Sequence, residues 1–287
     1  MKKLVDQILD LAEQHKMPLI LYYSFKTIHW KATRQLKKQK SKFEQFSKQF
    51  FEFITSGQGL DRIRETNTLN AIIFTGNFFL GIKNTRMAQD FYEKAIFLDR
   101  TKFIAWNNLG VLLYLNRDPI RAFKCFEKTI ELNSSMAAAW FNYGYVLLDM
   151  GREEEAIERF QKALELEPSN TQMWFLFGLA FSKRKDFQAA IKPFQMAIEQ
   201  QPDFEDAYEQ LSIAYQKIGE NGKSLKSLEK LLELNSKRPE TLAQMGAIYF
   251  KLGLRSKGTS SYMKAADIYE EKGFVKEAQD HRNLAKK

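Results

Sequence analysis

A 34-residue spacing of tryptophan constrains this chain more than any other feature. Trp106, Trp140 and Trp174 follow one another at this distance without insertions or deletions. Steps of the same length in both directions reach further large apolar residues: Ile72, Tyr208 and Leu242. A fixed period of this length is typical of repeat proteins, in which each unit packs only against its neighbours. The register predicts six repeats over residues 69–272.

Small residues recur at two further positions of the repeat. Four residues after the large apolar position stand Gly76, Gly110, Gly144, Gly178, Ser212 and Gly246. Twelve residues later stand Ala88, Ala122, Ala156, Ala190, Ser224 and Gly258. Glycine inside a helix costs about 1 kcal/mol relative to alanine, so its recurrence at one position needs a packing reason. We therefore predict two helices per repeat that approach each other closely at these positions.

The third repeat carries the fullest motif: Trp140, Tyr143, Gly144, Leu147, Ala156, Phe160, Ala163 and Pro168. It resembles the tetratricopeptide repeat (TPR) signature, which has tryptophan, then leucine and glycine, then tyrosine, followed by alanine, phenylalanine and proline. Tyr143 and Leu147 replace the leucine and the tyrosine of that signature. The resemblance implies an all-α fold, a right-handed α-solenoid of six helix-turn-helix TPR units with helical caps at both ends.

The register also predicts the domain boundaries. The six units are 69–102, 103–136, 137–170, 171–204, 205–238 and 239–272. Residues 1–68 form an amino-terminal helical cap and basic region, and 273–287 form a carboxy-terminal capping helix with Val275, Ala278 and Leu284 facing inward. Gly151, Gly219 and Gly253 stand where first helices must end. Pro193 falls inside a second helix, where we expect a kink.

Composition excludes several classes of protein. The single cysteine, Cys125, cannot form an internal disulfide, which fits a reducing compartment. No secretion signal follows the basic start, and the longest apolar run, residues 17–25, is too short for a spanning helix of about 20 residues. We expect a soluble, cytoplasmic protein, or one that is peripheral to a membrane.

The sequence offers no arrangement of residues for catalysis. The three histidines, His15, His29 and His281, lie in the terminal regions, and the glycines are spaced by the repeat instead of clustered in a phosphate loop. With one cysteine there is no thiol cluster for a metal. We therefore expect a chain that is not an enzyme and that has neither a metal site nor a cofactor.

The TPR resemblance implies a binding groove lined by the first helix of each unit. The family's ligand-contact positions fall here on Asn77, Asn107, Asn108, Val111, Tyr114, Phe141, Asn142, Tyr145, Phe175, Leu179, Asp206, Glu209 and Glu240. An amide both donates and accepts, so Asn108 and Asn142 are expected to hold a peptide backbone. The acidic end is expected to face a basic residue of the peptide. The alternative is that part of this stripe packs against the next unit as core.

A basic cluster in the first 68 residues offers a second binding surface. Residues 26–48 contain eight basic residues and a single acidic one, whereas the whole chain has a net charge of +9. The predicted docking patch is Lys31, Arg34, Lys37, Lys38, Lys40 and Lys42. Anionic membrane lipids are one candidate partner, and nucleic acid is the less favoured one. The simpler alternative is that the lysines only solvate the outside of a cap.

These features predict a scaffold or assembly factor that binds a protein or peptide segment in the groove. One alternative is a membrane-surface adaptor docked through the basic amino-terminal helix. Another is an accessory regulatory subunit of an enzyme or of a nucleic-acid machine. The sequence does not indicate an oligomeric state.

Overall fold

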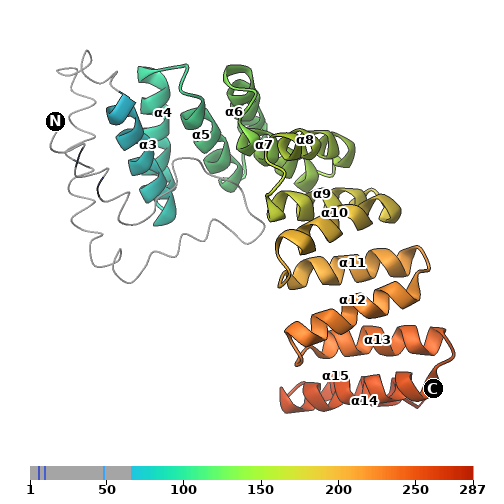
Figure 1. Ribbon diagram of the computed structural model, residues 1–287. Coiled ribbons are helices and arrows are strands. Elements are labelled where there is room, and N and C mark those ends of the chain that lie inside the picture. The colour runs from blue at the N-terminus through green and yellow to red at the C-terminus, as the bar shows by residue number, and fades with distance from the viewer. Residues whose placement is uncertain (1–5, 7–9, 11–47, 49–65, 287) are drawn as a thin grey trace. The chain divides into compact units, whose positions relative to one another are not determined.

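The computed structural model describes residues 66–286 together with the isolated positions 6, 10 and 48. Every regular element within residues 66–286 is a helix, and short turns join the helices (Figure 1). The predicted all-α fold is therefore confirmed. The predicted amino-terminal cap lies outside the described residues apart from those three positions.

The helices of residues 66–271 form successive pairs, and a last helix follows them. The pairs are α3 (Thr66–Gly81) with α4 (Thr85–Leu98), α5 (Phe103–Leu115) with α6 (Pro119–Leu132), α7 (Ala137–Asp149) with α8 (Glu153–Leu166), α9 (Thr171–Lys183) with α10 (Phe187–Gln200), α11 (Glu205–Lys217) with α12 (Asn221–Leu234) and α13 (Pro239–Lys251) with α14 (Arg255–Glu271), followed by α15 (Val275–Leu284). Each helix begins and ends within a few residues of the position that the 34-residue register predicts.

The chain divides into two compact units at the joint between α8 and α9. We call the described residues 66–168 the N-terminal block and residues 169–286 the C-terminal block. Within each block, each helix packs against the next one, and first helices of neighbouring pairs also meet, as α3 meets α5 and α9 meets α11. The 34-residue register runs through the division unchanged, so the sequence pattern did not predict it.

The turn inside each pair contains one residue in the left-handed region. Glycine occupies it at the three predicted positions, Gly151, Gly219 and Gly253, with φ between +73° and +85°. The other three turns place a basic residue there, with φ between 64° and 67°: Lys83, Arg117 and Lys185. In every one of these turns the next N–H donates to the carbonyl five residues earlier, at 2.8 to 2.9 Å. The register therefore fixes the turn even where glycine is missing.

The glycine position in each first helix faces an aromatic ring of the second helix. A methyl group on Gly178 would lie 2.6 Å from Phe194 Cε1, and one on Gly110 would lie 2.7 Å from Phe126 Cε1. These contacts explain the recurrence of glycine and confirm the predicted close packing. The fifth repeat has the buried Ser212 instead, and there the smaller Leu228 takes the place of the ring.

The last helix only partly follows its predicted orientation. Ala278 is buried as predicted, but Val275 is 68% exposed, so its predicted inward position is wrong. The imidazole of His281 packs against the ring of Tyr269, with centroids 5.1 Å apart, and Arg282 forms an ion pair with Glu270. These contacts orient α15 and leave its first residue in solvent. Helix α10 continues through Pro193, and the kink stays a prediction.

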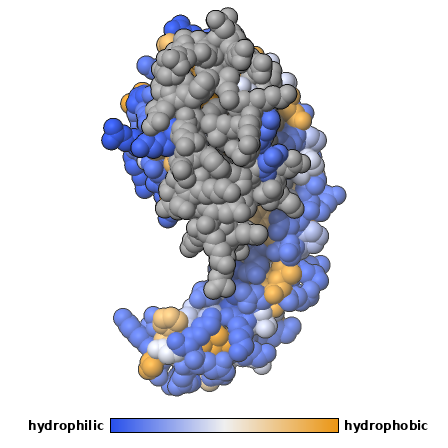
Figure 2. All heavy atoms as spheres, turned by 90° about the vertical axis from the view of Figure 1, so that its left-hand side faces the viewer, coloured by the Kyte–Doolittle hydropathy of each residue, from blue (hydrophilic) through white to orange (hydrophobic). Residues whose placement is uncertain are grey.

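The described surface in Figure 2 is mainly hydrophilic, with hydrophobic side chains in small separate patches. None of the helices in the described part of the chain is both long and apolar enough to cross a bilayer.

Candidate functional site

The asparagines that were predicted to line the groove form a chain of hydrogen bonds inside the N-terminal block. Asn142 Nδ2 donates to Asn107 Oδ1 at 2.9 Å, and Asn107 Nδ2 donates to Asn108 Oδ1 at 3.0 Å. Asn108 Nδ2 and the Tyr92 hydroxyl then both donate to Asn77 Oδ1, at 3.0 and 2.7 Å. We call these four asparagines the amide chain.

The amide chain is part of the core and joins α3, α5 and α7. Asn107, Asn108 and Asn142 are 0% exposed, and Asn77 is 5% exposed. Buried amides need partners, and here each one has another asparagine as a partner. The structure thus differs from the expectation that Asn108 and Asn142 present open amides to a peptide.

The apolar residues of the predicted groove are also mostly core in the N-terminal block. Val111 and Phe141 are 0% and 1% exposed. Tyr114 and Tyr145 are half-buried and meet edge to face, with centroids 6.0 Å apart, and the Tyr114 hydroxyl donates to Asp149. The stripe was predicted either to contact a ligand or to pack as core, and Val111 and Phe141 pack as core.

Two further predicted groove residues lie in the C-terminal block. Phe175 is 4% exposed, and its ring lies 4.9 Å from that of Phe204 and 5.9 Å from that of Phe194. Phe175 is therefore a core residue. Leu179, one helical turn further along α9, is half-buried.

The acidic end of the predicted groove is partly neutralised. Arg238 pairs with Glu205 at 2.9 Å and with Glu209 at 2.7 Å, while only 22% of the arginine side chain is exposed. Burial alone would lower the pKa of Arg238, but the hydrogen bonds and charges of the two carboxylates outweigh burial and raise it. Glu209 is thus committed to an internal ion pair.

The other two acids differ from Glu209. Glu240 is exposed and hydrogen-bonded with Tyr269, whose pKa is raised by burial and then by the charge of this carboxylate. Asp206 is half-buried at the start of α11. The acidic end therefore carries less free charge than the residue types predicted.

A half-exposed stripe remains on α11 and α13 of the C-terminal block. It consists of Gln210, Ile213, Gln216 and Gln244, which are all only partly buried. The Gln244 Oε1 atom is inaccessible to solvent and has no hydrogen-bond partner in the structure. We call these four residues the glutamine stripe. Gln210 and Gln244 occupy the repeat position of Asn108 and Asn142, so the 34-residue register could have identified them.

A pocket of about 690 Å³ opens in the N-terminal block between α4, α5 and α6. Its apolar wall is Ile96, Phe97, Trp106, Leu109 and Leu132, and its polar rim is Glu93, Arg100, Thr101 and Lys128. The volume lies in the range of ligand sites. Sequence reasoning missed this pocket, which we call the Trp106 pocket.

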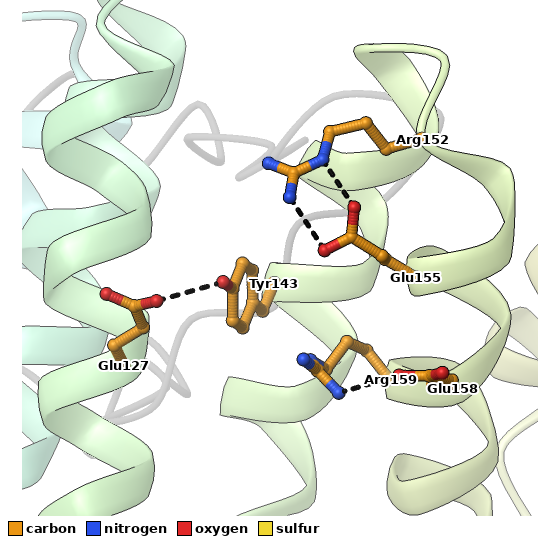
Figure 3. A network of polar contacts seen from close by, with 6 residues as sticks. All are labelled: Glu127, Tyr143, Arg152, Glu155, Glu158 and Arg159. Atoms are coloured by element: carbon orange, nitrogen blue, oxygen red, sulfur yellow. Dashed lines mark hydrogen bonds and ion pairs between the residues drawn. The ribbon is translucent and has the colours of Figure 1, made fainter.

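One repeat later, side chains of the chain itself occupy the equivalent positions, and Figure 3 draws Glu127, Tyr143 and Arg159 among them. Tyr143 donates from its hydroxyl to Glu127 Oε1 at 3.1 Å, and its ring lies 5.4 Å from that of Phe123. The Arg159 guanidinium lies 5.8 Å from the centroid of Trp140 and 5.4 Å from that of Tyr143. Burial, and then the charge of Glu127, raise the pKa of Tyr143, so its hydroxyl keeps its proton.

Charges in the C-terminal block are segregated between its two edges. The turns within helix pairs, which lie on one side of the block in Figure 1, are residues 183–186, 217–223 and 251–257, and they hold eight basic and two acidic residues. The joints between pairs are residues 199–206, 233–240 and 270–277, and they hold nine acidic and four basic residues. We call the three turns the turn edge. Both of its carboxylates already pair with a basic residue of the same turn.

The described residues contain neither an activated thiol nor a group of metal ligands. Burial raises the pKa of the Cys125 thiol to about 12, which keeps it protonated and unreactive. No group of three or more potential metal ligands occurs among residues that the structure describes. The predicted patch of Lys31, Arg34, Lys37, Lys38, Lys40 and Lys42 lies outside them.

Solved structures share the fold. YrrB, described as a TPR protein with an unusual peptide-binding site, is 24% identical with a TM-score of 0.59, covering 66% of this chain and 97% of YrrB. PilF of Pseudomonas aeruginosa is 20% identical with a TM-score of 0.61, covering 78% and 99%. A TPR protein fragment from Cytophaga hutchinsonii is 15% identical with a TM-score of 0.63, covering 83% and 98%. No curated protein matches the chain.

Three sequence models described as tetratricopeptide repeat match the chain, at residues 101–166, 144–203 and 205–238. They cover the helix pairs from α5 to α12, so the count of six repeats stays a prediction for the first and last pairs. Together with the paired helices and the glycine–aromatic contacts, these matches show that residues 101–203 and 205–238 consist of tetratricopeptide repeats.

Proposed function

We propose that this chain is a protein-interaction scaffold without catalytic activity, and that it holds an extended peptide on the glutamine stripe of α11 and α13. The observation that carries the proposal is that Gln210 and Gln244 are half-exposed at the repeat position where Asn108 and Asn142 are fully buried. Their amides can both donate to and accept from an extended peptide backbone.

The neighbours of Gln244 support the same ligand. Gln210 and Gln216 add amides that can donate and accept, and Ile213 adds an apolar contact between them. Main-chain hydrogen bonds provide affinity without sequence selectivity, and Asp206 and Glu240 favour a basic residue next to the bound segment. YrrB, described as having a peptide-binding site, shows that this fold is able to host one.

Selection from a random peptide library on the full chain tests the proposal. Gln244→Ala is expected to weaken the selected peptides about fivefold to tenfold, the equivalent of one hydrogen bond of about 1 kcal/mol. The matched control is Gln188→Ala, an exposed glutamine on α10. If every selected peptide binds Gln244→Ala and Ile213→Ser as tightly as the unchanged chain, the stripe is excluded as the binding site.

A second candidate function, attachment to an anionic membrane surface, is favoured by the turn edge. Leu252 and Leu254 are each 44% exposed in its last turn, between Lys251 and Arg255. Lys251 and Arg255 are themselves exposed. Exposed leucines flanked by basic residues suit the headgroup region of an anionic bilayer. The phosphate backbone of a nucleic acid would bind the basic residues but not the leucines.

Co-sedimentation with phosphatidylserine vesicles tests this second candidate. Because a basic residue near such a surface contributes about 1 kcal/mol, Lys251→Gln is expected to lower binding about fivefold. Lys276→Gln removes the same charge from the opposite edge and is expected to leave binding unchanged. Equal effects of the two substitutions, or binding that is insensitive to salt, would rule out docking through the turn edge.

A further inference from the structure

The Trp106 pocket is open because two side chains of the next repeat have no counterpart in it. A shift of 34 residues relates Tyr143 to Leu109 and Arg159 to Cys125. One repeat later Tyr143 packs against Phe123, and the Arg159 guanidinium lies over the ring of Trp140. Figure 3 draws Tyr143 and Arg159. Leu109 and Cys125 are shorter and both 5% exposed, so they leave the corresponding space in front of Trp106 open.

The wall of the pocket keeps the geometry that it has in the filled repeat. Trp106 Nε1 donates to the Arg100 carbonyl at 3.0 Å, and Trp140 Nε1 donates to the Ser134 carbonyl, which is the equivalent atom, at 2.8 Å. The two indoles are therefore fixed in the same way. The hydrogen-bond acceptor is conserved between the repeats as well, because Glu93 stands where Glu127 accepts the Tyr143 hydroxyl.

The outer side of the pocket has an aromatic residue where the next repeat has a charged one, and this difference favours an aromatic ligand. Phe97 is 69% exposed at the position where the next repeat has Glu131, and Lys94 Nζ lies 5.2 Å from the centroid of its ring. Exposure of a large aromatic ring at the mouth of an apolar pocket is typical of binding sites. At the rim, Lys128 pairs with Glu131 at 2.9 Å.

We propose that the Trp106 pocket binds a tyrosine side chain of a partner polypeptide, in place of the tyrosine that the chain itself supplies one repeat later. The ring packs against Trp106, Leu109 and Phe97, and the phenol hydroxyl donates to Glu93. Tyrosine suits such a site because it buries a large apolar area and still has a hydroxyl that can donate to the exposed carboxylate of Glu93 at the rim. This site lies in the N-terminal block and is separate from the glutamine stripe.

The pocket favours a tyrosine within a polypeptide over a free phenol. The mouth is bordered by Arg100 and Thr101 of the α4–α5 turn, which are both exposed and can contact the backbone on either side of the tyrosine. A free phenolic molecule would use only the inner contacts. N-acetyltyrosine amide is therefore expected to bind far more weakly than a tyrosine peptide, and equal affinities would overturn the assignment to a polypeptide.

A random peptide library selected on the full chain and then tested on Leu109→Tyr provides the experiment. Leu109→Tyr fills the pocket with the residue that the next repeat already holds at this position, so the fold should tolerate it, and the melting temperature checks this. Peptides that bind the unchanged chain and not Leu109→Tyr are expected to share a tyrosine. Replacing this tyrosine of the peptide by phenylalanine should weaken binding to the unchanged chain at least fivefold. The same replacement should not change the affinity for the Glu93→Ala variant, which lacks the acceptor of the hydroxyl.

A second variant keeps the test decisive if Leu109→Tyr does not fold. Phe97→Glu introduces the residue of the next repeat at an exposed position, and it is expected to weaken tyrosine peptides at least tenfold. Ile120→Glu, a substitution of another exposed apolar residue, is the control and should have no effect. If none of the selected peptides binds Phe97→Glu more weakly than the unchanged chain, or if those that do share no tyrosine, the proposal is overturned. Gln244→Ala leaves this pocket unchanged, so the test of the glutamine stripe and the test of the Trp106 pocket can fail independently.

Discussion

Gly178→Ala is expected to lower the free energy of unfolding by about 2 kcal/mol, since overpacking in a well-packed core typically costs about 1–3 kcal/mol. The added methyl group would lie 2.6 Å from Phe194 Cε1 and 2.7 Å from its Cδ1 atom, closer than carbon atoms approach. The ring is 0% exposed and its helix is held on both sides, so it has little room to move. Alanine is the better helix former by about 1 kcal/mol, and this gain only partly offsets the clash.

Urea denaturation followed by circular dichroism measures this effect, and Gly222→Ala is the control. Gly222 lies in the first turn of α12, and a methyl group there would meet no atom within 4 Å. The control is expected to be neutral or slightly stabilising. In the Gly178→Ala background, Phe194→Leu should recover part of the loss, because the fifth repeat combines Ser212 with Leu228 at the same two positions. A Gly178→Ala protein as stable as the unchanged chain would mean that the helices do not need this close approach.

The fold could be predicted from the sequence because its determinants are local and repeated. Gly178 and Phe194 are only 16 residues apart, and each repeat presents the same pair again, so the pattern is visible without knowledge of the long-range structure. The turns at Gly151 and Gly219 follow from the same register. The division between the blocks at Pro168 has no counterpart in the pattern, because the period describes packing within a repeat and not the strength of each junction.

The candidate site was predicted less well because a position on a helix face does not reveal what the side chain meets there. The register correctly placed Asn107, Asn108 and Asn142 on first helices. It did not show that these amides bind one another instead of facing a ligand. Two of the hydrogen bonds join residues that are 31 and 35 positions apart in the sequence, and one joins the adjacent Asn107 and Asn108. The same limit applies to Glu209, whose partner Arg238 comes from the following joint.

The Trp106 pocket is the opposite case, because the sequence held the signal. A comparison of repeats shows Leu109 and Cys125 where the next unit has Tyr143 and Arg159, and two shorter side chains at neighbouring positions indicate unfilled space. The comparison alone does not fix the indole of Trp106 or the exposure of Phe97, which make that space a candidate site.

Asn108→Ala is expected to destabilise the N-terminal block by at least about 2 kcal/mol, because leaving a buried polar group without its partner costs about 1–3 kcal/mol. The side chain accepts from Asn107 Nδ2 and donates to Asn77 Oδ1, both inside the core. Its removal therefore affects two buried amides at once and also leaves a small cavity. Asn107→Ala should have an effect of similar size, since it separates Asn142 from Asn108.

The coupling between these residues distinguishes the amide chain from a set of independent contacts. If the four side chains act as one network, the double variant Asn107→Ala with Asn108→Ala should be less destabilised than the sum of the two single variants, because the second substitution removes a group that the first has already left unsatisfied. Asn116→Ala, an exposed asparagine at the end of α5, is the control and should change stability by no more than about 0.5 kcal/mol. Strictly additive losses would show that these asparagines act as independent contacts. An Asn108→Ala protein that unfolds at the same urea concentration as the unchanged chain would show that the amide chain does not stabilise the block. In that case the earlier expectation of a role for Asn108 and Asn142 in peptide binding would have to be tested directly, by measuring the affinity of library-selected peptides for the same variants.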